Sequence, residues 1–247
     1  MEGRLIRKTT TTAAAALIAV FTSTAVSAFS APAAAAPITL PGDVDTTAAF
    51  AASTFPISPP DLINRAKQVL SPEIGIGTKD SGACLAEDFE FVAAVVGPIG
   101  REEYLNALGG FKLEESFDIQ QNTFGFTVDP LQPNRVWWYG RQISTQIAPF
   151  MGAEPSPAAA DSPTELTLPP QSFHMDFTED GLVKEFGFYT VDRRQGNTGG
   201  LGGAFGYFYG VGKPLPIREC QPYKPSFRFR MLGLIGKIGK KLSKGKI

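Results

Sequence analysis

The sequence predicts an α+β domain in which a curved antiparallel sheet wraps around helices that precede it, giving a cone-like shape. Two segments with helical spacing of apolar residues flank a short strand-like segment, and four long segments with the character of antiparallel strands follow them. An Asp-Gly pair, which is a strong hairpin signal, joins the last two strand-like segments. The helical segments are 58–70 and 101–108, and the strand-like segments are 88–92, 116–128, 135–150, 171–177 and 182–191.

The first helix has a clear start and stop. Ser58 suits the N-cap, two prolines occupy the first turn, and Asp61 lies near the positive end of the helix dipole. Apolar residues then recur at helical spacing up to Leu70, and Ser71-Pro72 ends the pattern. The second helix carries Tyr104 and closes at Gly109-Gly110.

Among the strand-like segments, the run Val136-Trp137-Trp138-Tyr139 suits a sheet that is buried on at least one side. The proline-rich residues 152–170 predict an inserted loop. The glycine- and aromatic-rich extension 193–223 shows no regular periodicity, and no phosphate-binding loop fits it. The folded domain is therefore predicted to span 58–192.

The N-terminus has the layout of a secretory signal peptide. Basic residues at positions 4–8 precede the apolar stretch 17–21, and Val26-Ser27-Ala28 predicts cleavage after Ala28. Residues 29–57 are rich in Ala, Thr and Pro and poor in charge, so we expect them to be disordered.

The stretch Ser27-Ala28-Phe29-Ser30-Ala31-Pro32 resembles the junction in the bipartite presequences of algae with complex plastids. There a signal peptide opens the route through the endoplasmic reticulum, and the exposed phenylalanine heads a transit peptide. The resemblance implies a plastid (chloroplast) protein. The alternative is a plain secreted protein whose first residue is Phe29.

Charge is distributed unevenly behind a formal net charge of −1. Residues 37–223 hold 12 basic and 23 acidic residues, whereas the tail 224–247 holds eight basic residues and no acid. An acidic body does not suit nucleic acid, so no nucleic-acid partner is expected. Cys84 and Cys220 do not have the spacing of metal ligands, and a single histidine cannot complete a zinc site with them. We therefore expect no metal and no cofactor. Two free thiols are favoured for the cysteines, and a disulfide between them is left open.

Three motifs in one order resemble the nuclear transport factor 2-like superfamily, closest to its SnoaL-like branch. They are Ala86-Glu87-Asp88-Phe89-Glu90-Phe91, Gly100-Arg101-Glu102-Glu103-Tyr104-Leu105 and Phe177-Thr178-Glu179-Asp180-Gly181-Leu182-Val183. The resemblance covers roughly 58–192 and implies a cone with an apolar pocket at its open end. It also implies a small apolar ligand or a scaffold role, and it leaves a homodimer open. Because members include both enzymes and pure binding proteins, the fold does not give the activity.

Candidate chemistry rests on few residues. A dehydratase of this superfamily needs two histidines where the chain has one, and Arg141-Gln142-Ile143 breaks the Arg-x-Asp pattern of its epoxide hydrolases. The remaining alternative is an isomerase or cyclase in which Asp176 orients His174 for proton transfer and Asp88 adds a second carboxylate. The aromatic residues expected to line the pocket are Tyr104, Trp138, Tyr139 and Tyr189.

The opposite orientation of the 171–177 strand is equally open. Phe173, Met175 and Phe177 share one face of that strand and look like its core side, which would turn His174 and Asp176 away from the pocket. In that case the enzyme hypothesis loses its basis.

The tail 224–247 predicts a basic amphipathic helix. Its apolar residues fall on one helical face, and opposite them lie the lysines predicted to contact an anionic membrane surface: Lys237, Lys240, Lys241 and Lys244. Its glycines oppose helix formation in water, so we expect the helix to form on lipid. A solvated tail, or one that docks on the acidic body, is the alternative.

Overall fold

The computed structural model describes residues 40–155 and 165–244, with side chains up to Lys237 in the last helix. The compact unit that carries the fold begins at Val44. Residues 40–43 belong to a separate unit, in which Asp43 closes a turn onto Leu40. The predicted signal peptide, the junction at Phe29 and residues 156–164 lie outside the described residues.

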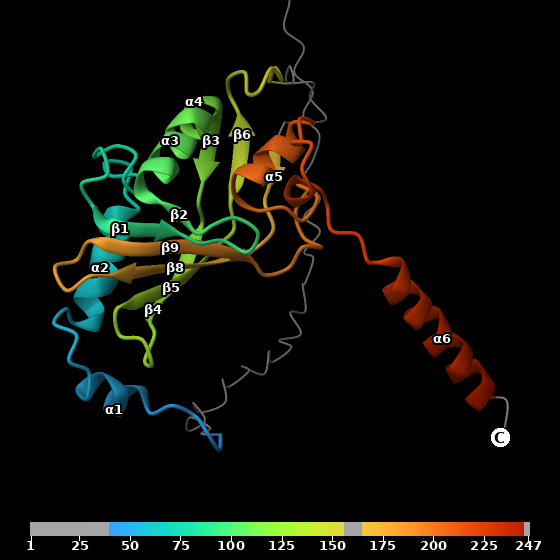
Figure 1. Cartoon of the computed structure of the whole chain (residues 1–247), viewed down its shortest axis with the longest axis horizontal. Helices are drawn as coiled ribbons and strands as arrows, with labels where there is room; N and C mark the ends of the chain where they lie inside the picture. Colours follow the sequence, from blue (N-terminus) through green and yellow to red (C-terminus); the bar gives the residue numbers. More distant parts are fainter. Residues whose placement is uncertain (1–39, 156–164, 245–247) are drawn as a thin grey trace, which may run out of the picture. The chain divides into compact units, whose positions relative to one another are not determined.

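The fold is α+β, and its main element is a six-stranded sheet with the strand order β2-β1-β9-β8-β5-β4 (Figure 1). Every neighbouring pair is antiparallel except β1 and β9, which run parallel. The predicted fold class, a curved antiparallel sheet with helices, is thereby confirmed. The strands are β1 (Leu85–Phe91), β2 (Ile99–Gly100), β4 (Thr123–Val128), β5 (Arg135–Gly140), β8 (Gln171–Phe177) and β9 (Val183–Thr190).

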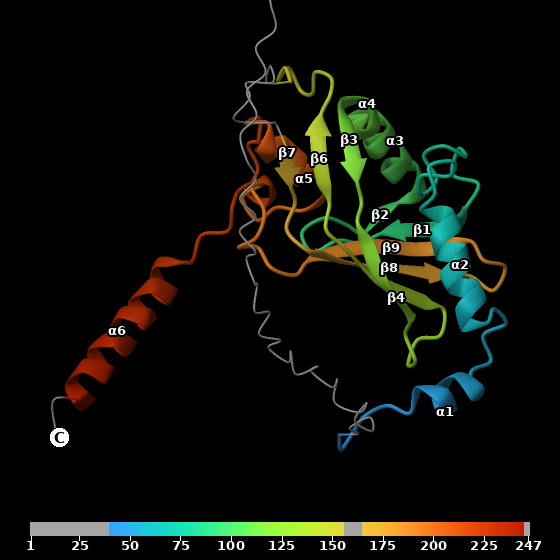
Figure 2. The same ribbon diagram turned by 180° about the vertical axis from the view of Figure 1, so that it is seen from behind.

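A second sheet of three strands has the order β3-β6-β7 and lies beside the first (Figure 2). It corrects two predictions, because the expected strands 116–128 and 135–150 are each divided between the two sheets. The first breaks at residues 121–122, where Asn122 takes a left-handed φ of 45°, and the second at residues 141–142. Strands that change sheets at such a corner turn both chains together. The strands are β3 (Phe117–Gln120), β6 (Ile143–Gln146) and β7 (Glu165–Thr167), the last inside the predicted loop 152–170.

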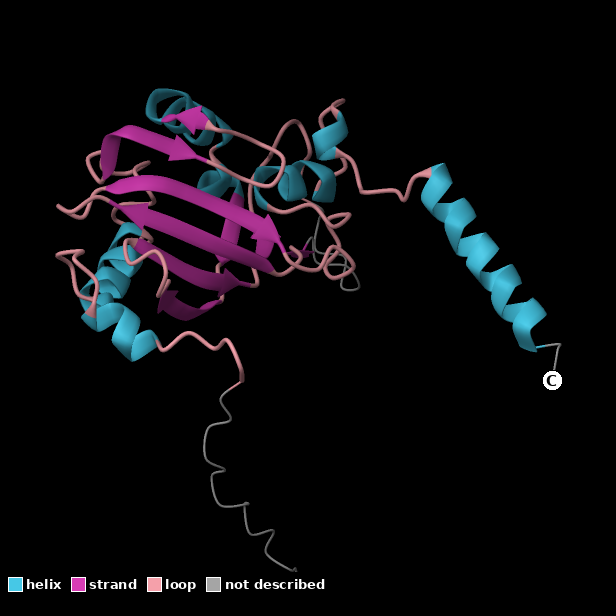
Figure 3. Cartoon of the chain, turned by 60° about the horizontal axis from the view of Figure 1, so that its bottom comes forward, coloured by secondary structure: helices cyan, strands magenta, loops and turns pink. Residues whose placement is uncertain are grey.

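Helices cover one face of the six-stranded sheet, which we call the inner face; it carries Trp138, Phe173 and Phe186. Helix α2 (Pro59–Val69) is capped by Ser58 as predicted, and it packs on β4 and β5. Helix α3 (Arg101–Phe111) packs on β1 and ends at Lys112, beyond the predicted glycine stop; α4 (Leu113–Ser116) follows. Figure 3 shows the strands side by side with helices against the sheet. Fully buried residues of this core include Leu62, Ala66, Val69, Val136 and Met175.

The ordered chain starts before residue 58. Helix α1 (Thr46–Ala51) lies within the stretch 29–57 that was expected to be disordered, and Asp45 caps it by accepting a hydrogen bond from the Ala48 N–H. Phe50, Phe55 and Ile57 are partly buried against the main core. These three apolar side chains give the segment a surface to bury, which its low charge did not reveal.

The glycine- and aromatic-rich extension also folds. It forms α5 (Gly203–Gly210) and the short helix η1 (Arg218–Cys220), and α5 covers the second sheet. This second core explains the aromatic residues of the extension, because they pack on β3, β6 and β7. Its buried members are Phe117, Phe150, Leu166, Leu168, Tyr207, Phe208 and Cys220.

The tail forms helix α6 (Phe227–Lys244), and its described side chains, up to Lys237, are all exposed. The other three predicted membrane-contact lysines belong to α6, but their side chains are not described. None of the helices in the described part of the chain has both the length and the apolar character needed to cross a membrane. Cys84 and Cys220 are buried, unpaired and in different cores.

Candidate ligand-binding pocket

A cavity of about 1220 Å³ opens between the inner face of the six-stranded sheet, helix α3 and the C-terminal extension. This volume is somewhat larger than the roughly 300–1,000 Å³ usual for small-molecule sites. Residues far apart in the sequence build its wall, since β1, β5, β8, β9, α3 and the start of α5 all contribute. Its aromatic lining on the sheet and the first turn of α3 consists of Phe91, Tyr104, Trp138, Phe173, Phe186 and Phe188, and Phe111, Phe205, Tyr207 and Tyr223 line it from outside the six-stranded sheet.

The strand register explains why these rings gather on one side. Trp138 lies opposite Phe173 on the neighbouring strand, and Phe173 lies opposite Phe188 on the next. Residues that face each other across strands project from the same face. The rings of Trp138 and Phe173 accordingly stack with centroids 5.4 Å apart, and those of Phe173 and Phe188 lie 5.9 Å apart.

Tyr104 brings a phenol to the cavity from α3. It is 1% exposed and donates a long hydrogen bond of 3.4 Å to the Ile76 carbonyl. Burial raises the pKa of Tyr104 far above its usual range, so the phenol stays neutral at every physiological pH.

Three hydrogen-bonded glutamines form part of the polar wall, which also includes Gln221 and three threonines. Gln171 is completely buried at the start of β8, and its side chain donates to that of Gln142 at 3.0 Å. Gln142 in turn donates to Gln121, while the backbone N–H of Gly203 donates to Gln171 at 3.1 Å. All four residues line the cavity. We did not predict the glutamines as site residues, although alternation puts Gln171 on the same face as Phe173.

Charged residues that line the cavity are confined to exposed positions. They belong to α3, α4, the segment 193–224 and the single positions 79 and 112. Both signs occur among them, so the rim has mixed charge and the interior of the wall has none. The acids are Glu103, Glu114, Glu115 and Glu219, and the bases are Lys79, Lys112, Arg193, Arg218 and Lys224.

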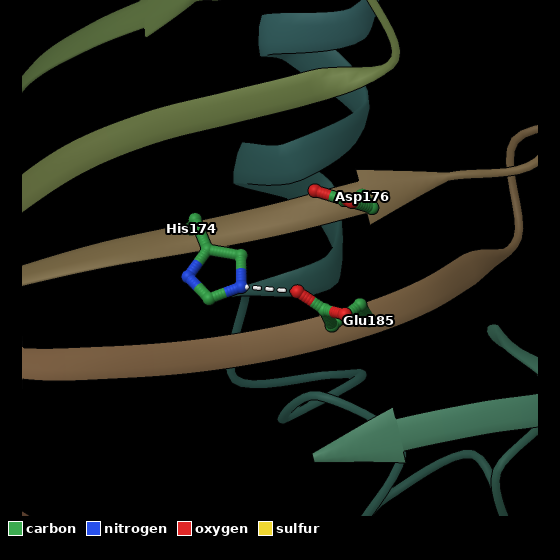
Figure 4. Close-up of side chains that lie close together, drawn as sticks. All are labelled: His174, Asp176 and Glu185. Carbon is green, nitrogen blue, oxygen red and sulfur yellow. Dashed lines mark hydrogen bonds and ion pairs between the residues drawn. The ribbon is translucent and has the colours of Figure 1, made fainter. Parts of the chain in front are cut away.

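His174 and Asp176 lie on the opposite, outer face of the sheet and do not line the cavity. Figure 4 shows them together with Glu185 on one side of β8 and β9. The His174 Nε2 atom lies 2.7 Å from a Glu185 carboxylate oxygen. Arg135 donates to both oxygens of Asp176, at 2.5 and 2.7 Å, and to Glu185 at 2.9 Å. Of the two orientations that the sequence left open, the structure has the one in which Phe173 and Met175 face the core and His174 and Asp176 turn away from the pocket.

The electrostatics of this outer cluster favour an ion-pair network. Burial lowers the pKa of His174, and the nearby Arg135 adds to that effect, so the ring is neutral near pH 7. Asp176 raises the pKa of Arg135. Ligand atoms of His174, Asp176 and Glu185 come within 4.8 Å of one another, a spacing that suits a metal ion. Arg135 already supplies the positive charge between the two carboxylates, so these residues fit the guanidinium better than a metal.

The other predicted site residues divide between the two faces. Asp88 is exposed and pairs with Lys184 at 3.3 Å, away from His174 and Asp176. Tyr104 and Trp138 line the cavity as expected. Tyr139 and Tyr189 do not: both are exposed, the first stacking with Phe124 and the second with His174. Their odd-numbered positions in β5 and β9 turn them to the outer face.

Comparison with solved structures finds proteins of related shape at low identity. A candidate polyketide cyclase from Xanthomonas campestris pv. campestris is 18% identical, with 52% of this chain and 86% of that chain covered and a TM-score of 0.38. A candidate SnoaL-like polyketide cyclase from Jannaschia sp. CCS1 is 19% identical, with 53% and 85% covered and a TM-score of 0.36. A candidate hydroxylase from Streptomyces galilaeus is 13% identical, with 74% and 93% covered and a TM-score of 0.39.

No protein-family model and no curated protein matches the chain. The site is therefore interpreted from its own residues.

Proposed function

We propose that this protein binds a small, largely apolar ligand in the cavity on the inner face of the sheet. The observation that carries the proposal is a cavity of about 1220 Å³ with ten aromatic residues and a short polar strip in its wall. Concave, mostly apolar sites with a few placed polar groups are the usual form of small-molecule sites. The absence of charge from the buried part of the described wall favours a ligand that is uncharged where it is enclosed.

Ligand binding is better supported than acid–base catalysis. A proton-transferring pair has to reach the substrate, and His174 and Asp176 lie on the other face of β8 from the cavity. Asp88 is not beside them, and the carboxylates that line the cavity are exposed at its rim. Catalysis by Asp176, His174 and Asp88 stays a prediction that the geometry does not favour.

Filling the cavity tests the proposal. Ala107 lines it from α3, so Ala107→Trp should occupy part of the space, whereas Ala51→Trp adds the same bulk to an exposed position of α1. Titration with the fluorescent apolar probe Nile red should show saturable binding to the wild type and the Ala51→Trp variant, and at least tenfold weaker binding to Ala107→Trp. Equal binding by all three would place the probe elsewhere and refute the proposal.

We also propose that the protein is delivered to the plastid by way of the endoplasmic reticulum, with secretion as the alternative destination. The support is the sequence Ser27-Ala28-Phe29-Ser30-Ala31-Pro32 after an apolar stretch. Residues 1–56 fused to a fluorescent protein should enter plastids, and the same fusion with Phe29→Ala should not. Equal plastid import of the two fusions would show that Phe29 is not needed for targeting and would refute the role proposed for the junction.

A third proposal concerns α6, which we expect to bind an anionic membrane surface. Its sequence combines apolar residues with basic ones and contains no acid, and its described apolar side chains are exposed. The full chain should sediment with vesicles containing phosphatidylglycerol and not with neutral phosphatidylcholine vesicles. Lys237, Lys240, Lys241 and Lys244 changed together to Glu should abolish sedimentation; retention of binding would count against the tail.

A further inference from the structure

Three of the four glutamines in the cavity wall form a continuous hydrogen-bonded chain that begins at the backbone of α5. The Gly203 N–H donates to the Gln171 side-chain oxygen, the Gln171 nitrogen to the Gln142 oxygen, and the Gln142 nitrogen to the Gln121 oxygen. The chain crosses from the six-stranded sheet to the bend between β3 and β4. It is thus a polar strip across a cavity whose other buried lining is mainly aromatic and aliphatic.

The direction of this chain is fixed by its first member. A backbone N–H can only donate, so the Gln171 atom that faces Gly203 has to be the oxygen. The Gln171 nitrogen must then face Gln142, and the same reasoning sets the amide of Gln142 and then that of Gln121. The side-chain amides therefore all point their donor ends from α5 towards residue 121.

Glycine is what lets α5 come this close. A Cβ on Gly202 would lie 2.6 Å from the Gln171 oxygen, and one on Gly203 would lie 2.4 Å from the ring of Phe188. Gly203 also takes a φ of +54°, which disfavours other residues. Gly202 and Gly203 thus allow the backbone to approach closely enough for the Gly203 N–H to donate to the side chain of Gln171.

The chain leaves donor capacity unused. Each side-chain amide nitrogen carries two hydrogens, and Gln171 and Gln142 each spend one of them within the chain. The side chain of Gln121, at the exposed end of the chain, accepts from Gln142, and its amide nitrogen donates to no polar atom of the described residues. Gln121 is exposed and Gln142 is partly buried, so an apolar group placed against their amides would displace water without replacing its hydrogen bonds, which is unfavourable.

We propose that Gln121, Gln142 and Gln171 determine specificity by selecting a ligand that carries an acceptor oxygen, such as a carbonyl, on an apolar body. This inference rests on the proposed function, because it assigns the chemistry of the ligand that the cavity holds. The oxygen accepts from the glutamine chain while the apolar body lies against the aromatic residues. A hydrocarbon of the same size fills the same space but leaves the amides unsatisfied.

The matched compounds 9-fluorenone and fluorene test the inference, since they differ mainly by one carbonyl group. A single neutral hydrogen bond changes affinity by about 2- to 12-fold, so the wild type should bind fluorenone more tightly by that factor. Gln142→Met keeps the length of the side chain and removes the amide; it should bring the ratio of the two affinities close to one. Gln68→Met, at an exposed position of α2, should keep the wild-type ratio.

Three outcomes are informative. Equal affinities of the wild type for the two compounds would overturn this inference and leave the apolar pocket standing, whereas binding of neither would refute the proposed function and this inference with it. A preference that survives Gln142→Met would also count against the glutamine chain. Should Gln142→Met fail to fold, Gln121→Met at an exposed position serves instead, with the thermal melt of each variant as the check on folding.

Discussion

Replacing Asp176 by Asn should destabilise the protein strongly without weakening ligand binding. The Asp176 side chain is 9% exposed and accepts three hydrogen bonds, two from Arg135 and one from Gln132. Asn has one acceptor oxygen, so in either orientation its amide nitrogen faces a donor. The variant loses one or two hydrogen bonds to a charged group, each of which contributes about 1.5–3 kcal/mol. Because Arg135 keeps its bond to Glu185, we expect the free energy of unfolding to fall by about 2–4 kcal/mol.

Asp88→Asn is the matched control for this prediction. Asp88 is also an acid of the predicted site, but its side chain is 67% exposed and its partner Lys184 is exposed as well. Such a surface pair contributes about 0–1 kcal/mol. Urea unfolding at pH 7, followed by tryptophan fluorescence, should therefore separate the two variants by at least 1 kcal/mol. Equal unfolding free energies, or a loss of Nile red binding by folded Asp176→Asn, would refute the structural role assigned to Asp176.

Three further predictions concern single residues. Burial holds the pKa of His174 below the unfolded value of 6.5, so the folded state resists protonation of the ring. The free energy of unfolding should therefore be fully retained above pH 6.5 and should fall as the pH drops below it. In urea titrations between pH 5 and 7.5, His174→Gln should reduce this dependence of the unfolding free energy on pH. Gly203→Ala combines backbone strain with a clash against Phe188, whereas Gly212→Ala, at a φ of +74° with open space around it, introduces backbone strain alone. Gly203→Ala should therefore lower the free energy of unfolding by about 1–3 kcal/mol more than Gly212→Ala does. Equal melting temperatures of the two variants would contradict the clash. Burial raises the pKa of Cys84 to about 12, so its thiol in the folded protein should react with dithionitrobenzoate at least a hundredfold more slowly than in the urea-unfolded chain. Rapid reaction of the thiol in the folded protein would indicate that the core is open to the reagent.

Local signals predicted the elements that depend on local interactions. Ser58 caps α2 because its side chain meets the first free N–H groups of that helix, and this needs only the next few residues. Likewise, the Asp-Gly turn at residues 180–181 joins β8 to β9 as expected, with Gly181 at a φ of +79°. These features follow from backbone and capping chemistry that a short window of sequence contains.

The sheet corner and the folded extension could not be predicted in this way. A single Asn122 is a weak turn signal within residues 116–128, and the break there also depends on the chain between β5 and β6 turning at the same point. Helix α5 has glycine at several of its eight positions, which argues against a helix in isolation. Its stability comes from burying Tyr207 and Phe208 against the second sheet, a contact that the local sequence does not reveal.

For the candidate site, alternation predicted which residues share a face and not which face is covered. His174 and Asp176 were expected together, and they are together, with Glu185 beside them. The orientation of β8 depends on α2 and α3 packing over Phe173 and Met175, and this tertiary contact is not encoded in the sequence of the strand itself. The predicted pocket residues were all tyrosine or tryptophan, so Phe186 and Phe188 of β9 and the glutamines of β8 and the two strand bends went unnoticed.

The outer cluster and the pocket wall are linked through strand register. Arg135 lies opposite Asp176, and Asp176 lies opposite Glu185, so the ion pairs form only in the observed pairing of β5, β8 and β9. A shift by one residue would turn Asp176 into the apolar core and Phe173 to solvent. Buried ion pairs add little net stability compared with apolar packing, but an unpaired buried carboxylate is strongly destabilising, so the cluster penalises the shifted pairing. We infer that the charged cluster, although it does not touch the cavity, keeps Trp138, Phe173 and Gln171 on the face where the ligand is proposed to bind.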